Sequence, residues 1–428
     1  MGQLSDNTIL IRRGTIIDPS SDLNRTVVDI LIDQGRVSSI SEKPLQSKTT
    51  QVIDATGCYI MPGLLDLRCQ LKDPGFEHQE DVKTGAAAGA SSGFTALAVH
   101  PTTDPVVQNK SQIEYLKQLS DKVLPDILPV GATTQDMQSQ HITEMFDMRQ
   151  AGAVGFSNGD NGYESSGTLT RALLYSKQIG GLLMSHALDA DLAVGASVNE
   201  SAVTIHTGLK QQPDLAETSQ IKKEIDISEY ADAPIHFSHI SSAKSVDLIR
   251  KAKKAGLKVS CDVSIWHLIY TDKVIVEYDT NFKVTPPFRS ESDRKALIKG
   301  VLDGTIDAIV SDHNPQNIEN KQVEFDYADF GINGLQSFYS VYNDKLSSQI
   351  DLETFVQRVA FSPRNLLGLA SNDISVGNKA DFWVADPTLD WAYNKTSNLS
   401  RSENNPLFNT SLKGKCRFVV NGNNHNSY

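Results

Sequence analysis

The segment from Asp66 to Gly75 holds the residues with the clearest chemical consequence. It follows an apolar run that ends at Leu67 and leads into a turn at Asp73-Pro74-Gly75, which is the pattern of a buried strand and its exit loop. Residues two apart on a strand project to the same side, so Arg68 and Gln70 should lie together at its C-terminal end. Two histidines there would bind a metal ion, but Arg has no lone pair to donate and an amide is a weak zinc ligand. The pattern therefore indicates a metal site that has been dismantled.

Short apolar strands alternate with helical stretches through the middle of the chain. We expect eight strands: Tyr59 to Leu67, Phe94 to His100, Leu124 to Thr133, Ala153 to Asn158, Gly181 to Ala187, Pro234 to Ile240, Lys258 to Ser264 and Ile306 to Asp312. Helices are expected at Glu80 to Ser92, Lys110 to Lys122, Gln138 to Ala151, Leu169 to Gly180, Ala243 to Lys254, Ser292 to Leu302, Leu335 to Asn343 and Leu352 to Gly368. The alternation predicts an α/β fold, a (β/α)8 TIM-type barrel whose strand ends carry the site. Residues 188–233 are an insertion, helical around Leu215 to Tyr230.

Both ends of the chain carry strand-like segments outside the barrel. Residues 8–60 give short apolar runs separated by turns, and two more runs follow Leu369, at Ala380 to Pro387 and at Lys415 to Gly422. The economical arrangement is a small composite β-sandwich domain built from both termini. We therefore expect three segments: residues 1–60 and 370–428 in the sandwich, and residues 61–369 in the barrel. Asn398 to Asn409 is the most loop-like tract.

Composition excludes several classes of function. The chain has 428 residues, 39% of them hydrophobic and 21% charged, and a net charge of −12, which disfavours nucleic acid and anionic membranes as partners. The four cysteines are far apart, so a disulfide framework or thiolate zinc site is not expected. The first residues lack a secretory pattern and no 18-residue apolar segment occurs. We predict a cytoplasmic protein with small-molecule or protein partners.

Eight short phrases, in order along the chain, resemble one family. They are Met61 to Asp66, Asp73 to Glu77, Gly93 to Thr95, Gly155 to Ser157, His236 to Ser242, Lys283 to Arg289, Ser311 to Pro315 and Phe330 to Leu335. With these phrases the sequence resembles dihydroorotase of the amidohydrolase superfamily, in its larger bacterial type. The resemblance implies a binuclear zinc site, whose shared hydroxide attacks a ring amide while an Asp moves the proton.

The resemblance also shows which metal positions have changed. The family's His-x-His pair is replaced by Arg68 and Gln70, and its acidic bridging position by Asn158, in the loop Ser157-Asn158-Gly159-Asp160, so the bridging carboxylate is displaced or missing. The family ligands His186, His239 and Asp312 remain, Asp312 at the vestigial general-base position. A zinc site supplies about 10–16 kcal/mol, roughly 3 kcal/mol per ligand, so three losses leave little affinity.

The residues at the family's substrate-binding positions have changed as well. Lys72 stands where the family places an Arg that clamps the substrate carboxylate, and Thr102 and Thr285 stand where it places asparagines. We interpret Lys72 as a surface or loop cation rather than a substrate clamp.

Several residues at the strand ends have structural interpretations. An unpaired buried Asp is costly, so we expect Arg68 to reach across the barrel mouth to Asp312. The histidines His100, His236, His267 and His313 are expected to be structural, and Gly331 and Gly334 to serve the path of a mouth loop.

The leading interpretation is a catalytically inactive dihydroorotase-like protein without a cofactor. Some bacterial aspartate transcarbamoylases assemble with such a homologue, so the resemblance implies a structural subunit in pyrimidine biosynthesis, in homo- and hetero-oligomers with the aspartate transcarbamoylase catalytic subunit. One alternative is an active cyclic amidohydrolase with a single zinc on His186, His239 and Asp312. Another is a sensor that uses the old pocket for binding only.

Overall fold

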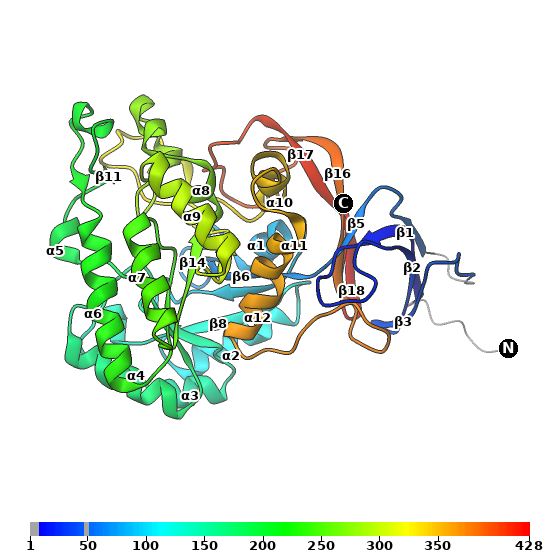
Figure 1. Ribbon diagram of the computed structural model, residues 1–428, viewed down its shortest axis with the longest axis horizontal. Coiled ribbons are helices and arrows are strands. Elements are labelled where there is room, and N and C mark those ends of the chain that lie inside the picture. The colour runs from blue at the N-terminus through cyan, green and yellow to red at the C-terminus, as the bar shows by residue number, and fades with distance from the viewer. Residues whose placement is uncertain (1–7, 47–50) are drawn as a thin grey trace.

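A closed barrel of eight parallel strands forms one end of the computed structural model, which describes residues 8–46 and 51–428 (Figure 1). Its strands pair in chain order: β6 (Leu64–Cys69), β7 (Phe94–Val99), β8 (Asp126–Ala132), β9 (Gly155–Ser157), β10 (Leu182–Ser185), β13 (Ile235–Phe237), β14 (Val259–Ser264) and β15 (Ala308–Val310). A parallel bridge between Cys69 and His313 brings the last strand segment back to the first. Seven of these strands lie within the segments predicted from the apolar runs, and the barrel is confirmed. The strand expected from Tyr59 to Leu67 is divided: its first residues, Tyr59–Pro62, belong to the second sheet, and the barrel strand β6 ends two residues later than expected, at Cys69.

Helices surround the barrel strands (Figure 1). They include α1 (Val82–Ala90), α2 (Lys110–Ser120), α4 (Ser166–Gln178), α6 (Leu215–Ala231), α7 (Ala243–Lys254), α9 (Glu291–Asp303), α10 (Phe338–Val341), α11 (Leu352–Val356) and α12 (Ser362–Leu366). The helix expected from Gln138 was wrong in its start, because α3 spans only Met145–Gln150. Asp136, Met137 and Ser139 have positive φ angles of 51°, 58° and 58°, which a continuous right-handed helix excludes.

A mixed sheet built from both termini lies beside the barrel (Figure 1). The strands are β1 (Thr8–Ile16), β2 (Val27–Asp33), β3 (Arg36–Ser41), β4 (Gln51–Asp54), β5 (Tyr59–Pro62), β16 (Asp381–Tyr393), β17 (Thr410–Asn421) and β18 (Asn424–Ser427). Their order is β18-β17-β16-β5-β1-β2-β3, with β4 beside β1. The antiparallel pairing of β5 with β16 joins the two termini, and buried apolar residues from both ends form a core separate from the barrel's.

Two irregular segments cover the end of the barrel where the strands finish. The insertion after β10 contains the short strands β11 (Val198–Asn199) and β12 (Gln211–Gln212) before α6. Residues 394–409 form no helix or strand, as expected for Asn398 to Asn409, yet they are fixed by side-chain hydrogen bonds to the mouth loops, such as Ser400 to Glu80 and Asn404 to the carbonyl of Gly331. These two segments therefore cover the barrel mouth.

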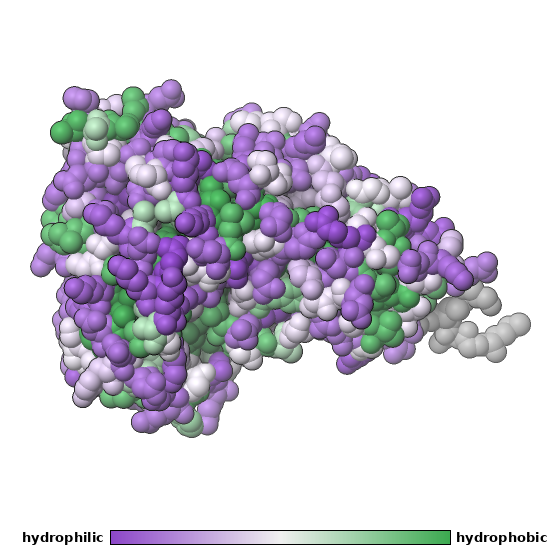
Figure 2. Space-filling view, viewed as in Figure 1, coloured by the Kyte–Doolittle hydropathy of each residue, from purple (hydrophilic) through white to green (hydrophobic). Residues whose placement is uncertain are grey.

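Within residues 8–46 and 51–428, no helix combines the length and apolar character needed to cross a membrane. On the face shown in Figure 2, apolar residues occur in small separate groups among polar ones. Cys58, Cys69, Cys261 and Cys416 are all buried, and none of them is paired with another.

Candidate site at the barrel mouth

The guanidinium of Arg68 lies at the centre of the barrel mouth between two carboxylates. Its Nε donates to Asp312 Oδ1 at 3.2 Å, and its Nη2 donates to Asp160. Its Nη1 lies 3.4 Å from His100 Nδ1, and Nε2 of that ring donates to the Leu67 carbonyl at 3.1 Å. Arg68 is only 2% exposed. The expected contact between Arg68 and Asp312 is confirmed, with a second acid that was not expected to take part.

Asp160, rather than Asn158, supplies the carboxylate that follows the fourth barrel strand. The side chain of Asn158 accepts from the backbone N–H and the hydroxyl of Thr134, both at 3.1 Å, so it holds a neighbouring loop. Gly159, at φ 63°, turns the chain between them. The sequence signal was present in the loop Ser157-Asn158-Gly159-Asp160, but strand periodicity cannot say which residue of a turn points inward. Thus the acid is displaced by two positions, not absent.

Gln70 and Lys72 extend this network along the first barrel strand. Gln70 Nε2 donates to Asp160 Oδ2 at 3.3 Å, and Lys72 Nζ donates to Gln70 Oε1 at 2.8 Å. Lys72 lies in the loop that follows β6, which agrees with one part of its assignment as a surface or loop cation, but it is 8% exposed and therefore not at the surface. The backbone at Lys72 is left-handed, with φ 60°, and it leads into the turn at Gly75. Burial lowers the pKa of Lys72 to about 8.

The two acids around Arg68 differ in their protonation. Burial raises the pKa of Asp312 to about 7 although Arg68 opposes it. For Asp160, burial also acts to raise the pKa, but the charge of Arg68 and then that of His186 outweigh it, and the pKa lies below its ordinary value. The ionised partner of Arg68 at neutral pH is therefore chiefly Asp160, while Asp312 takes up a proton more readily than an ordinary aspartate.

His186 and His239 follow β10 and β13 and stack on each other, with ring centroids 4.7 Å apart. His239 Nε2 donates to the Thr285 carbonyl at 2.9 Å, whereas His239 Nδ1 and both nitrogens of His186 are buried without a hydrogen-bond partner. Burial, with the nearby positive charge of Arg68, lowers the pKa of His239 well below its ordinary value. Burial likewise lowers the pKa of His186, to about 4. Both rings are therefore neutral at pH 7.

The two threonines at the family's substrate positions differ in their contacts. Thr285 contributes its carbonyl to His239, and the buried hydroxyl of Thr102 has no hydrogen-bond partner. The methyl group of Thr102 packs against Gly159, where an added Cβ would lie 2.5 Å from it. This close packing fills space beside Asp160 with an apolar group.

The remaining barrel histidines have protein partners, as expected of structural residues. His236 Nε2 lies 2.9 Å from Asp262 Oδ2, and His267 Nε2 donates to the Pro286 carbonyl at 3.0 Å. His313 Nδ1 accepts from the backbone N–H of Gly334 at 3.2 Å. Together with His100 they support the loops around the mouth.

Comparison with known proteins gives the relationship directly. A family model described as dihydro-orotase-like matches residues 57–245. A dihydroorotase of Thermoanaerobacter sp. is 36% identical over 409 residues, which covers 95% of this chain and 94% of that protein. This chain belongs to the dihydroorotase-like family. A dihydroorotase of Geobacter sp. is 35% identical over 414 residues, with 96% of this chain and 97% of that protein covered.

Solved structures confirm the fold of this dihydroorotase-like chain. An L-hydantoinase (dihydropyrimidinase) from Arthrobacter aurescens superposes with a TM-score of 0.85 at 21% identity, covering 97% of this chain and 95% of that one. A dihydropyrimidinase from Brevibacillus agri superposes with a TM-score of 0.82, also at 21% identity, covering 98% and 94%. The barrel with its sheet domain is therefore an established architecture.

The residues at the mouth do not fit the metal centre that the family resemblance implies. Within the described part of the chain, no three His, Cys, Asp or Glu side chains are grouped so that they could hold a metal ion. Both acids that lie at the mouth contact the guanidinium of Arg68 instead. A divalent ion placed beside these acids would be repelled by a fixed, buried positive charge.

Proposed function

We propose that this chain is a non-catalytic member of the dihydroorotase-like family and serves as a structural subunit of an aspartate transcarbamoylase complex in pyrimidine biosynthesis. The observation that carries the loss of catalysis is the guanidinium of Arg68 bridging Asp160 and Asp312. The guanidinium lies between the two acids, and the family chemistry needs a metal-activated water at that position.

The remaining groups cannot replace that chemistry. A general base must reach the proton that it removes, and Asp312 is held by Arg68. Lys72 donates to Gln70 and is buried, so it is not free to clamp a substrate carboxylate with the two-pronged geometry of an arginine. Amide hydrolysis is left without an activated nucleophile and without a free base.

The assembly role is supported by what the chain retains. The barrel, its surrounding helices and the sheet built from both ends of the chain are all present, although the side chains at the barrel mouth are arranged around Arg68. A fold without its catalytic groups still offers its surface to partners, and the family resemblance implies assembly with the catalytic subunit of aspartate transcarbamoylase. We propose homo- and hetero-oligomers of this type in the cytoplasm, where unpaired buried cysteines such as these persist.

One preparation can test both halves of the proposal. Purified untagged protein should contain less than about a tenth of a zinc per chain by elemental analysis and should not turn over dihydroorotate. After mixing with the aspartate transcarbamoylase catalytic subunit of the same organism, it should elute with that subunit in one larger species during size-exclusion chromatography with light scattering. Separate elution at micromolar concentrations would refute the assembly role.

An active enzyme is the second candidate, and one observation favours it. Three imidazole nitrogens, two on His186 and one on His239, are neutral, buried and without partners, as metal ligands would be. This candidate requires about one zinc per chain together with ring opening of dihydroorotate or a hydantoin. Saturable binding of a pyrimidine precursor without turnover would instead identify the old pocket as that of a sensor.

A further inference from the structure

Four asparagines of this chain are followed directly by glycine, a pair with its own covalent chemistry. The glycine nitrogen attacks the side-chain carbonyl carbon of the asparagine, a cyclic imide forms, and the amide nitrogen leaves as ammonia with the glycine proton. Water then opens the imide to aspartate or isoaspartate. Glycine permits the attack because it has no Cβ and a wide range of backbone conformations. The four pairs are Asn158-Gly159, Asn161-Gly162, Asn333-Gly334 and Asn421-Gly422.

The fold protects three of these pairs. Asn158, Asn333 and Asn421 are buried, so their side chains cannot turn toward the next backbone nitrogen without displacing packed neighbours. The glycine N–H groups that would react are also held: Gly159 donates to Ser157 Oγ at 3.1 Å, Gly334 to His313 Nδ1 at 3.2 Å and Gly422 to the Ala380 carbonyl at 2.7 Å. Each of these bonds must break before the nitrogen can attack.

The pair Asn161-Gly162 has neither form of protection. It lies in the irregular segment between β9 and α4, and Asn161 is exposed. The backbone N–H of Gly162 donates no hydrogen bond to residues 8–46 or 51–428. The side chain of Asn161 is held weakly, because its Nδ2 lies 3.4 Å from the Met137 carbonyl, beyond the usual hydrogen-bond range. Both reacting groups are therefore available.

Water reaches this pair through a surface hollow of about 500 Å³. Asn161 and Gly162 both line the hollow, together with Asp160 and the loop that contains Met137 and Ser139. Water is the one co-reactant that opening of the imide needs. The hollow therefore supplies the remaining component of the reaction.

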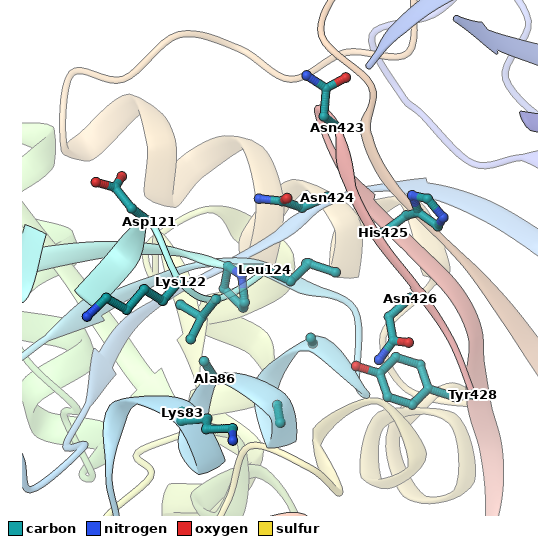
Figure 3. A pocket seen from close by; sticks show the side chains of 14 residues that line it. Lys83, Ala86, Asp121, Lys122, Leu124, Asn423, Asn424, His425, Asn426 and Tyr428 are labelled. Atoms are coloured by element: carbon teal, nitrogen blue, oxygen red, sulfur yellow. The ribbon is translucent and has the colours of Figure 1, made fainter. Parts of the chain in front are cut away.

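Exposure alone does not select an asparagine for this reaction. Figure 3 shows Asn423, Asn424 and Asn426 near the C-terminal end of the chain, and all three are exposed. Each is followed by a residue with a side chain, which hinders the attack. The N–H of Ser427, which follows Asn426, also donates to Asn426 Oδ1 at 3.1 Å.

We propose that Asn161 is a site of spontaneous deamidation, and that its products disturb the barrel mouth through the neighbouring Asp160. A carboxylate at position 161 cannot donate to the Met137 carbonyl, and isoaspartate adds one atom to the backbone directly after Asp160. Both changes displace the loop that holds Asp160 against Arg68. The modification depends on this loop alone, so it goes beyond the assembly role proposed above.

The reaction can be followed at all four pairs in one sample. Full-length protein is incubated for days at mildly alkaline pH in water enriched in oxygen-18, digested, and analysed by liquid chromatography with mass spectrometry. Opening of the imide introduces one labelled oxygen, and enzymatic methylation by protein isoaspartyl methyltransferase counts the isoaspartate. A parallel incubation in guanidinium chloride removes the fold, and Asn161→Gln removes the reactive pair but keeps a side-chain amide.

In the folded protein, Asn161 should react at least about tenfold faster than the other three asparagines, equivalent to about 1.4 kcal/mol in activation free energy. In guanidinium chloride the four rates should differ by less than that. Asn161→Gln should abolish labelling at position 161. Equal rates at the four pairs in the folded protein, or no reaction at Asn161, would overturn the proposal.

The effect on the mouth has its own test. Incubated parent protein should lose free energy of unfolding in urea, whereas Asn161→Gln incubated for the same time should not. In the Asp160→Asn background the loss should be smaller, because the ionic contact with Arg68 is already absent. Equal losses with and without Asp160 would show that the modification does not act through this carboxylate.

Discussion

Replacing Arg68 by Met tests whether its guanidinium holds the barrel mouth together. Arg68 is 2% exposed and contacts Asp160 and Asp312. Removing one partner of a buried ion pair costs about 3–5 kcal/mol, because the other charge stays buried. Two pairs are broken here, but Asp312 has its pKa raised to about 7 by burial and takes up a proton readily. The side chain of Asp160 is 33% exposed, so water offsets part of the cost of leaving that carboxylate unpaired. We therefore expect a loss of about 3 kcal/mol, the lower end of that range.

The free energy of unfolding should be measured by urea titration followed by circular dichroism at pH 7, with the slope m compared between variants. Arg25→Met is a matched control, since Arg25 also meets a carboxylate, Glu353, through two hydrogen bonds but has a side chain 67% exposed. It should leave the free energy of unfolding nearly unchanged. Adding Asp160→Asn and Asp312→Asn to Arg68→Met should restore most of the lost stability. If Arg68→Met costs no more than Arg25→Met, the reasoning is refuted.

Three further predictions concern metal, pH and backbone conformation. The double variant Arg68→His and Gln70→His should bind zinc, as measured by elemental analysis. An unchanged zinc content would show that the site lacks more than these two ligands. Burial raises the pKa of Glu224 from 4.5 to about 7. Between these two pH values the folded chain keeps a proton that the unfolded chain releases. The Glu224 carboxyl therefore destabilises the fold increasingly as pH rises from 4.5 to 7. The free energy of unfolding of Glu224→Gln should therefore equal that of the parent near pH 4.5 and exceed it by up to about 3 kcal/mol at pH 8. An equal gain in the free energy of unfolding at both pH values would contradict the raised pKa. Gly331→Ala should lower the melting temperature, because φ is 135° and an added Cβ would lie 2.4 Å from a backbone oxygen. Gly57→Ala, at φ 78° with open space around it, should lower it less.

Local sequence patterns were sufficient for the barrel and for part of the site. Parallel strands buried on both faces are continuous apolar runs, so segments such as Phe94 to His100 could be located without tertiary information. The substitutions at positions 68 and 70 could be interpreted from ligand chemistry alone. The contact between Arg68 and Asp312 followed from the cost of an unpaired buried carboxylate.

Residues whose roles depend on turns and on packing could not be placed in this way. Asp160 is 92 residues from Arg68 in the sequence, and its approach depends on the left-handed turn at Gly159. Lys72 was expected to be a surface or loop cation, and it does lie in a loop, yet that loop buries its side chain, whose Nζ donates to Gln70. The sequence by itself determined that Arg68 and Gln70 stand where the family resemblance implies two metal-binding histidines. Only the tertiary structure decided which groups replaced them, because burial and the direction of a side chain after a turn depend on segments far apart in the chain.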